Sequence, residues 1–326
     1  MSHFSNERSI LAAICVSWVA ACSAADRPNL SSDQKVSDLS AMCMFVEAEY
    51  AYFDIKKTDW KKTCTAYAPQ AAAARDMDSF IWVLERTLAE LYDHHAHLGT
   101  NTSNSARLIQ TGAQVVATWR DGNAFVSDAL AGSPAEGAGL RTGVQILAID
   151  DLPINEVVDL IAPKYLSGED PAAREWALQV ALVGRHNRAA VRLLIKQENA
   201  IQEIRYAYAT TERTTLLTYR RVGTVGCIRF DNSLGEQALV NEFDIALSQL
   251  SGVRSLVIDL RVTPSGGVSS VARGILGRFV QRLQSYQRHE LVSEFCSTGI
   301  RRVWVEYVSP RGMLFQKPVR RPPTDR

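Results

Sequence analysis

One stretch constrains the fold of this chain more than any other: the segment LVIDLRVTPSGG at Leu256–Gly267. Its apolar opening is typical of a buried strand. A turn must follow, because Pro264 fixes one φ and the pair Gly266 and Gly267 permits positive φ. An amphipathic segment comes next, with apolar residues at helical spacing: Val271, Ala272, Ile275, Leu276 and Phe279. The pattern predicts either an ordinary βα turn or a turn that aims backbone N–H groups at a developing negative charge.

The composition indicates a globular protein with more than one domain. A chain of 326 residues can bury a sizeable core and form two or three domains. Its basic and acidic side chains nearly balance, at 36 and 35, so the net charge is +1. Without a basic excess, we expect no nucleic-acid partner.

The first residues, 1–25, have the pattern of an export leader. An almost wholly apolar run at Ile10–Ala21 is too short to span a bilayer as a mature helix. It ends in VAAC at Val19–Cys22, which resembles a bacterial lipoprotein cleavage box. Two outcomes stay open: a lipidated Cys22 that anchors the protein to a membrane, or ordinary cleavage two or three residues later. We therefore expect a protein that is periplasmic or held at the membrane by a lipid.

Helical periodicity follows this leader. Apolar residues recur at helical spacing over residues 36–50, and Tyr50–Phe53 and Asp59–Trp60 extend this helical region. A second helix is expected over Met77–Tyr92, again with one apolar face. Both patterns predict an N-terminal helical unit whose aromatic residues pack in its core.

The cysteines suggest one disulfide and no metal site. Cys43 and Cys64 lie in neighbouring helical patterns and could pair in an oxidising compartment. Cys227 falls in a strand pattern and is expected to be buried. The sequence contains no CxxC pair, so a structural zinc site is not expected, and no cofactor is implied.

The segment LYDHHAHL at Leu91–Leu98 holds three histidines and allows three interpretations. A metal site is the first, although His94, His95 and His97 do not share a helical face and no HExxH pattern is present. A polar helix end is the second, because histidine complements the negative end of the helix dipole. Catalysis is the third, because a neutral imidazole can accept a proton near neutral pH.

The middle of the chain carries a glycine-rich segment, Gly132–Asp151, that is similar to the PDZ segment GSPAxxAGLxxGDxIlxInG. Ser133 can cap a short helix that begins with Pro134. The resemblance implies a unit that binds an extended peptide as an added strand and captures its terminal carboxylate. A PDZ fold without a ligand is the alternative. The peptide-binding residues that the resemblance implies are Gln114, Val115 and Val116.

The opening stretch, DLRVTPSGG, resembles the DLRxNxGG segment of the tail-specific, or C-terminal processing, serine peptidases. Thr263 stands where asparagine is usual and Ser265 where the first glycine is usual, so the loop departs from the family pattern at these two positions. The resemblance implies that the backbone N–H of Gly266 or Gly267 helps form an oxyanion hole.

The residues DHH at 93–95 resemble the DSH segment of the tricorn-like branch of these peptidases. Position by position, the match places His95 where that branch has its general base. The implied chemistry is acyl transfer on unstructured polypeptides, in which a serine attacks and His95 accepts its proton.

The resemblance implies an α+β multidomain fold. Its expected parts are a leader (1–25), an N-terminal helical cap (26–106), a PDZ-like β-rich domain (107–207), a partial α/β peptidase core of the ClpP/crotonase-like type (208–319) and an aberrant tail (320–326). Early and late strands of the PDZ-like part are expected at Val115–Trp119, Ala189–Lys196 and Ile204–Tyr208. The core elements are expected at Val222–Phe230, Glu236–Leu250, Val253–Arg261 and Val303–Val308, with its first two main strands parallel.

In the peptidases, the serine nucleophile follows a further central strand. Residues 313–319 resemble the approach to that strand, but two prolines and several arginines in Arg320–Arg326 do not suit a buried strand. The expectation is a frameshifted or truncated chain with an unpaired sheet edge and no activity by itself. The alternative function is a non-catalytic, peptide-binding or scaffolding protein that uses the PDZ-like part alone.

Overall fold

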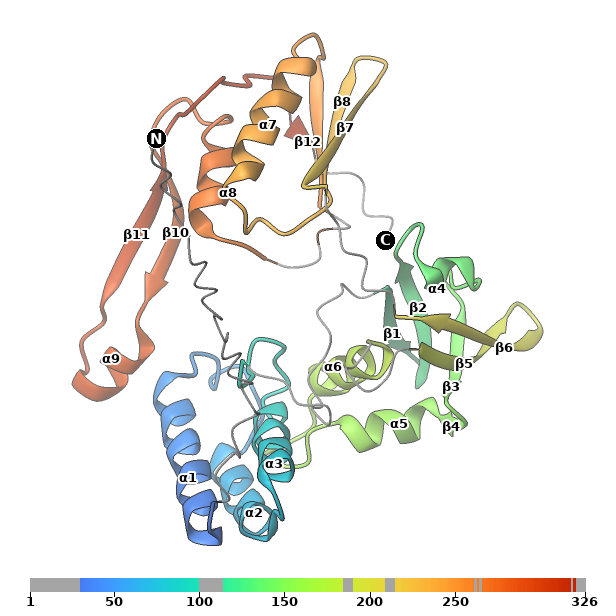
Figure 1. Ribbon diagram of the computed structural model, residues 1–326, viewed down its shortest axis with the longest axis vertical. Helices are drawn as coiled ribbons and strands as arrows, with labels where there is room; N and C mark the ends of the chain where they lie inside the picture. The colour runs from blue at the N-terminus through green and yellow to red at the C-terminus, as the bar shows by residue number, and fades with distance from the viewer. Residues whose placement is uncertain are drawn as a thin grey trace, which may run out of the picture.

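The computed structural model of the protein describes residues 30–99, 114–183, 190–208, 215–260, 263, 266–317 and 319–320. Within these ranges the chain is an α+β protein with nine helices and three sheets (Figure 1). Its buried apolar side chains form three clusters, one in the first helices, one in the middle sheet and one around a parallel sheet. None of the helices in this part of the chain combines the length and the apolar character that a membrane crossing requires.

The helical unit consists of α1 (Ser32–Glu49), α2 (Trp60–Ala73) and α3 (Met77–Ala89). A turn at residues 51–55 separates α1 from α2, so the region holds three helices where the sequence suggested two. The break has a local cause, because the Asp59 side chain accepts a hydrogen bond from the Lys62 N–H and begins a new helix.

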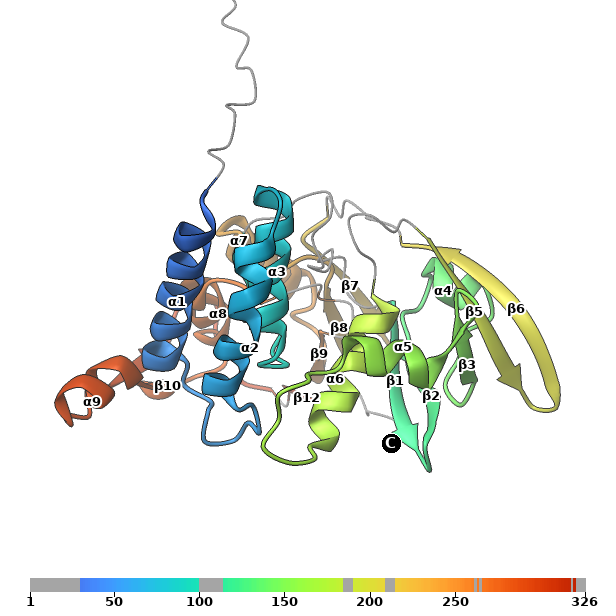
Figure 2. The ribbon, with the colours of Figure 1, turned by 90° about the horizontal axis from the view of Figure 1, so that it is seen from below.

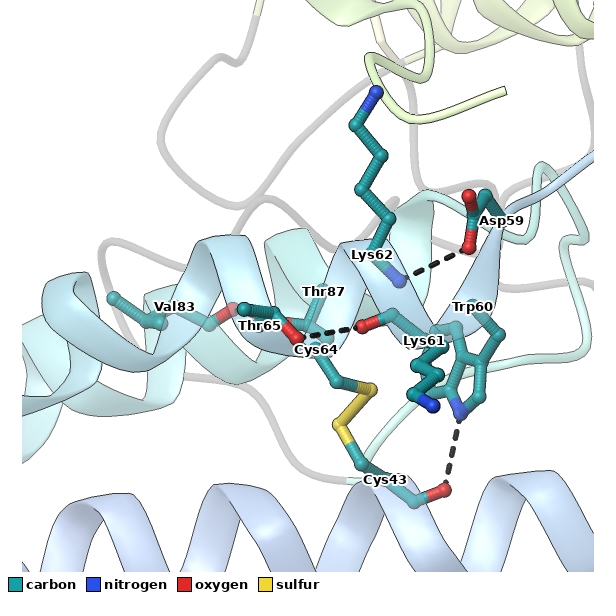
Figure 3. The surroundings of a disulfide bond; sticks show 9 residues. All are labelled: Cys43, Asp59, Trp60, Lys61, Lys62, Cys64, Thr65, Val83 and Thr87. Atoms are coloured by element: carbon teal, nitrogen blue, oxygen red, sulfur yellow. Dashed lines mark hydrogen bonds between the residues drawn. A yellow bond between two sulfur atoms is a disulfide. The ribbon is translucent and has the colours of Figure 1, made fainter. Parts of the chain in front are cut away.

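A disulfide joins the first two helices, as the sequence suggested (Figure 3). It links Cys43 of α1 to Cys64 of α2 across a separation of 21 residues. Beside it, the indole Nε1 of Trp60 donates to the Cys43 carbonyl oxygen at 3.0 Å. Trp60 and the disulfide therefore fix α1 against the start of α2.

The middle unit is an antiparallel sheet with helices beside it. The sheet runs β1 (Val115–Arg120), β2 (Asn123–Ala129), β3 (Gln145–Ile149), β5 (Ala190–Gln197), β6 (Ala200–Ala207), and β4 (Leu152–Pro153) pairs with β3. The helices are α4 (Pro134–Gly137), α5 (Ile154–Ile161) and α6 (Pro171–Leu182). The predicted cap of the short helix is confirmed, because the Ser133 side chain accepts from the Glu136 N–H.

A buried carboxylate joins the helical unit to the middle unit. Glu90 is 1% exposed, and its Oε2 accepts from the backbone N–H groups of Lys164 and Tyr165 at 2.7 and 3.0 Å. Its Oε1 accepts from the Tyr67 hydroxyl at 3.0 Å. Glu90 thus satisfies groups from both units at the point where α3 ends.

The third unit is built on a sheet in the order β12 (Val319–Arg320), β9 (Ser255–Asp259), β8 (Val225–Phe230), β7 (Leu217–Val222). The parallel pairing of β8 with β9 is confirmed, and α7 (Ala238–Gln249) connects the two strands. α8 (Ser269–Leu276) follows β9, as predicted.

Three expectations for this sheet differ from the structure. The expected strand Val222–Phe230 begins later, at Val225, because the chain turns at Gly223, whose φ of +59° suits glycine, and Val222 ends the preceding strand of the hairpin. Arg320 was expected in a tail that leaves the sheet edge unpaired, but Val319 and Arg320 pair in parallel with Leu256 and Val257. Cys227, expected to be buried, is half-buried on β8.

A two-stranded arm extends from the third unit (Figure 1). It consists of β10 (Gln284–Glu290), α9 (Val292–Thr298) and β11 (Val303–Val308), with the two strands antiparallel. The strand predicted at Val303–Val308 is therefore confirmed. Figure 2 shows α9 at the tip of this arm, on the side of the molecule where α1 lies.

Candidate active site

Asp93 and His95 form a hydrogen-bonded pair just after α3. The Asp93 carboxylate accepts from the His95 backbone N–H at 2.9 Å, and its Oδ1 lies 3.1 Å from His95 Nδ1. Its Oδ2 accepts from the Tyr50 hydroxyl at 2.8 Å, which fastens the segment to the end of α1. An ionised carboxylate can only accept, so Nδ1 donates and Nε2 is the acceptor of the neutral ring. This is the tautomer that a general base requires.

Asp93 remains ionised in this arrangement. Burial alone would raise the pKa of Asp93, but hydrogen bonds from the His95 N–H, the Tyr50 hydroxyl and the His95 ring outweigh burial and hold the pKa below its usual value. Burial and the hydrogen bond to Asp93 raise the pKa of Tyr50. Tyr50 therefore stays a donor, and Asp93 stays an acceptor for His95.

The other two histidines of the segment have different surroundings. The ring of His94 lies against Trp176 of α6, with ring centroids 5.9 Å apart, and burial lowers the pKa of its imidazole. His97 Nδ1 accepts from the Gly99 N–H at 3.0 Å. In the described ranges of the chain, no group of three or more His, Cys, Asp and Glu side chains is placed to hold a metal ion.

Gly267 lies in a turn that has no room for a side chain. A Cβ atom at this position would lie 2.2 Å from the carbonyl carbon and oxygen of Leu234. The next residue, Val268, donates its N–H to the Leu234 carbonyl at 3.0 Å, immediately before α8 begins. A Cβ atom at Gly266 would meet nothing within 4 Å. The two glycines therefore differ: Gly267 permits a close approach of two loops, and Gly266 is sterically open.

Those two loops follow the carboxyl ends of parallel strands. The loop that contains Leu234 follows β8, and the glycine turn follows β9. Thr263 ties the second loop to the first strand, because its hydroxyl donates to the Phe230 carbonyl at 3.3 Å. In open α/β sheets, ligands bind beyond the carboxyl ends of the strands. The glycine turn thus lies at the end of the sheet where ligands bind in folds of this kind.

The predicted catalytic residues lie in two different units. His95 follows α3 in the helical unit, whereas Gly266 and Gly267 precede α8 on the parallel sheet (Figure 1). The His95 side chain is 99% exposed and bonds to Asp93. A pocket of about 440 Å³ lies between α2 and α3 near Trp82, and none of these residues lines it. The structure therefore supplies an oriented histidine and a tight glycine turn, each within its own unit.

Comparisons with known proteins identify this architecture. No protein-family model matches the sequence, and no curated protein matches it. Mature CPAF in complex with lactacystin is similar in structure, with a TM-score of 0.50 and 15% identity, over 79% of this chain and 62% of that chain. The photosystem II D1 C-terminal processing protease has a TM-score of 0.47 and 17% identity, over 90% of this chain and 74% of that chain. The chain has the fold of the tail-specific, C-terminal processing proteases.

The fold places Val115 and Val116 on β1, at the edge of the middle sheet, and Gln114 directly before this strand. The Gln114 side chain donates to the Ala207 carbonyl at 3.2 Å and accepts from the Ala135 N–H at 3.2 Å. Val115 is 1% exposed and belongs to the core, whereas Val116 is 39% exposed. The side chains of Gln114 and Val115 thus support the unit from within, and their role in binding remains a prediction.

Three further predicted or missed residues concern the candidate site. Cys22, the predicted lipidation site, lies outside the described residues. Tyr50 was missed as a functional residue, because the helical periodicity that ends with it indicated only packing. Glu90 was also missed, although an acidic residue at the end of an apolar helix next to the histidine segment was a signal that could have been followed.

Proposed function

We propose that this protein is an exported homologue of the tail-specific serine peptidases and that it acts on unstructured polypeptides. The observation that carries the proposal is the fold that the chain shares with CPAF, of which it spans 62% of the length. The ordered Asp93–His95 pair supports it, because a histidine oriented through Nδ1 by a carboxylate is the arrangement a serine nucleophile needs.

In the proposed mechanism, Nε2 of His95 accepts the proton of a serine hydroxyl as the serine attacks the peptide carbonyl. The backbone N–H of Gly266 or Gly267 then stabilises the oxyanion. In the peptidases that the sequence resembles, the serine nucleophile follows the strand that corresponds to the one beginning at Val319. We propose that residues 1–326 do not hydrolyse peptide bonds by themselves, because the His95 ring bonds to Asp93 and is 99% exposed, with no serine hydroxyl bonded to it in the described residues.

The middle unit is proposed to be a PDZ-like domain that binds polypeptide C-termini. The position of β1 at a sheet edge supports this, because an added peptide strand needs an edge. The protein is expected to bind a peptide with a free, apolar C-terminus at a Kd on the order of micromolar. Isothermal titration with that peptide and with its amidated form tests the idea. Equal binding of the two forms would show that no carboxylate site exists.

Export and lipid anchoring form a separate part of the proposal. The Cys43–Cys64 disulfide supports export, because disulfides persist in oxidising compartments. The mature protein is expected to begin at an acylated Cys22, and mass spectrometry of its N-terminal peptide measures this. An unmodified N-terminus at Met1 would contradict export.

The second candidate function is a non-catalytic scaffold that binds peptides through the middle unit alone. The exposure of the His95 side chain, 99%, favours it, since a general base is normally enclosed with its substrate. The two functions differ in the fate of a bound peptide. A scaffold leaves the peptide intact under every condition, whereas a peptidase homologue cleaves it once a nucleophile is present.

A further inference from the structure

β1 is an edge strand whose outer side faces α6 (Figures 1 and 2). Among the described strands it pairs with β2 alone. Alternate residues of a strand direct their backbone N–H and C=O groups to opposite sides. The outward groups of β1 are therefore the ones that an added peptide strand would use.

Side chains of α6 already form hydrogen bonds with two of these outward groups. The Gln179 side-chain amide donates to the Ala117 carbonyl oxygen. The Trp119 N–H donates to Glu175 Oε2 at 3.4 Å, and the Trp119 indole N–H donates to the Arg174 carbonyl at 3.3 Å. The Arg174 guanidinium also lies over the Trp119 ring, 5.0 Å from its centroid. The bonds to Ala117 and Trp119 thus satisfy two successive outward positions of the strand.

The spacing of these two side chains along α6 matches the spacing of the outward groups along β1. Glu175 and Gln179 are four residues apart on one helical face, a rise of about 6 Å. Ala117 and Trp119 are two residues apart on an extended strand, a rise of about 6.7 Å. Because the two spacings nearly agree, α6 presents one acceptor and one donor in register with the edge.

We propose that Glu175 and Gln179 form a plug on the peptide-binding edge of β1, which a C-terminal peptide must displace in order to bind. This inference rests on the proposed PDZ-like function. Only side chains need to move, because α6 itself is anchored: Ala177 and Leu178 are fully buried, and the N-terminal Asp170 accepts from the Tyr92 hydroxyl at 2.7 Å.

The test compares peptide affinities of full-length variants. Gln179→Ala removes the donor to Ala117, so a peptide with a free apolar C-terminus is expected to bind about tenfold more tightly than to the wild type. Gln202→Ala is the matched control, because Gln202 is an exposed glutamine on β6 at the opposite edge of the same sheet. It is expected to leave the affinity unchanged. Fluorescence anisotropy of a labelled peptide measures all three proteins.

A second measurement needs no peptide. Glu175→Ala removes the acceptor of the Trp119 N–H, so hydrogen exchange at that amide is expected to accelerate about tenfold in the unliganded protein. Equal peptide affinity in wild type and Gln179→Ala, or unchanged exchange at Trp119 in Glu175→Ala, would overturn the plug. Binding that is indifferent to amidation of the peptide would instead overturn the proposed carboxylate site, and the exchange result would still decide whether α6 occupies the edge.

Discussion

Replacing Gly267 by alanine is expected to destabilise the third unit by about 3 kcal/mol. The added Cβ would lie 2.2 Å from the Leu234 backbone, which is a rigid neighbour and not the end of a flexible side chain. Relief of this overlap requires the two loops to separate, which would break the hydrogen bond from the Val268 N–H to the Leu234 carbonyl. Urea unfolding followed by circular dichroism measures the loss.

Gly266→Ala is the matched control for that substitution. A Cβ atom at Gly266 meets nothing within 4 Å, so the change is expected to cost less than about 0.5 kcal/mol. If the two alanine variants were equally stable, the close approach between the glycine turn and the Leu234 loop would be wrong. The glycine turn would then have no defined shape with which to orient its N–H groups.

Replacing Glu90 by alanine is expected to cost about 3 kcal/mol or more. The substitution leaves the Lys164 and Tyr165 N–H groups and the Tyr67 hydroxyl without their acceptor, in a place where Glu90 itself is 1% exposed. The loss falls at the junction between the helical unit and the middle unit. Urea unfolding measures it, and faster proteolysis of the segment around residue 164 is expected alongside.

Glu90→Gln tests the hydrogen bonds of this side chain separately from its negative charge. The amide oxygen of glutamine can still accept from both backbone N–H groups, and its NH₂ can donate to the Tyr67 hydroxyl. This variant is expected to retain most of the stability that Glu90→Ala loses. A glutamine variant as unstable as the alanine variant would show that the negative charge, rather than the hydrogen bonds, holds the junction.

Local signals predicted much of this fold. The strand, glycine turn and helix that follow Ser255 could be predicted, because the residues of each part favour the conformation that this part adopts. The cap at Ser133 was also predicted, since a cap depends only on neighbouring residues. The pairing of Cys43 with Cys64 was predicted because few other cysteines could be a partner for either. The parallel pairing of β8 with β9 followed from the connecting helix.

Other features depend on contacts that the local pattern does not contain. The hairpin at Gly223 interrupts a run of β-prone residues whose continuity predicted one strand. α6 was missed because half of its buried residues are alanines, which give little periodic signal. The hydrogen bond from Tyr50 to Asp93 joins residues 43 positions apart, so the histidine segment was recognised but its orientation was not predictable.

The most direct test of the account is intact-mass spectrometry of the 326-residue chain after incubation with a fluorophosphonate. Such a reagent modifies only a serine that a general base activates. We expect an unmodified mass, because the His95 ring bonds to Asp93 and is 99% exposed, and no serine hydroxyl bonds to that ring in the described residues. A stoichiometric adduct on one serine would contradict it, since that serine would have to be a nucleophile among residues assigned here to turns, caps and helices.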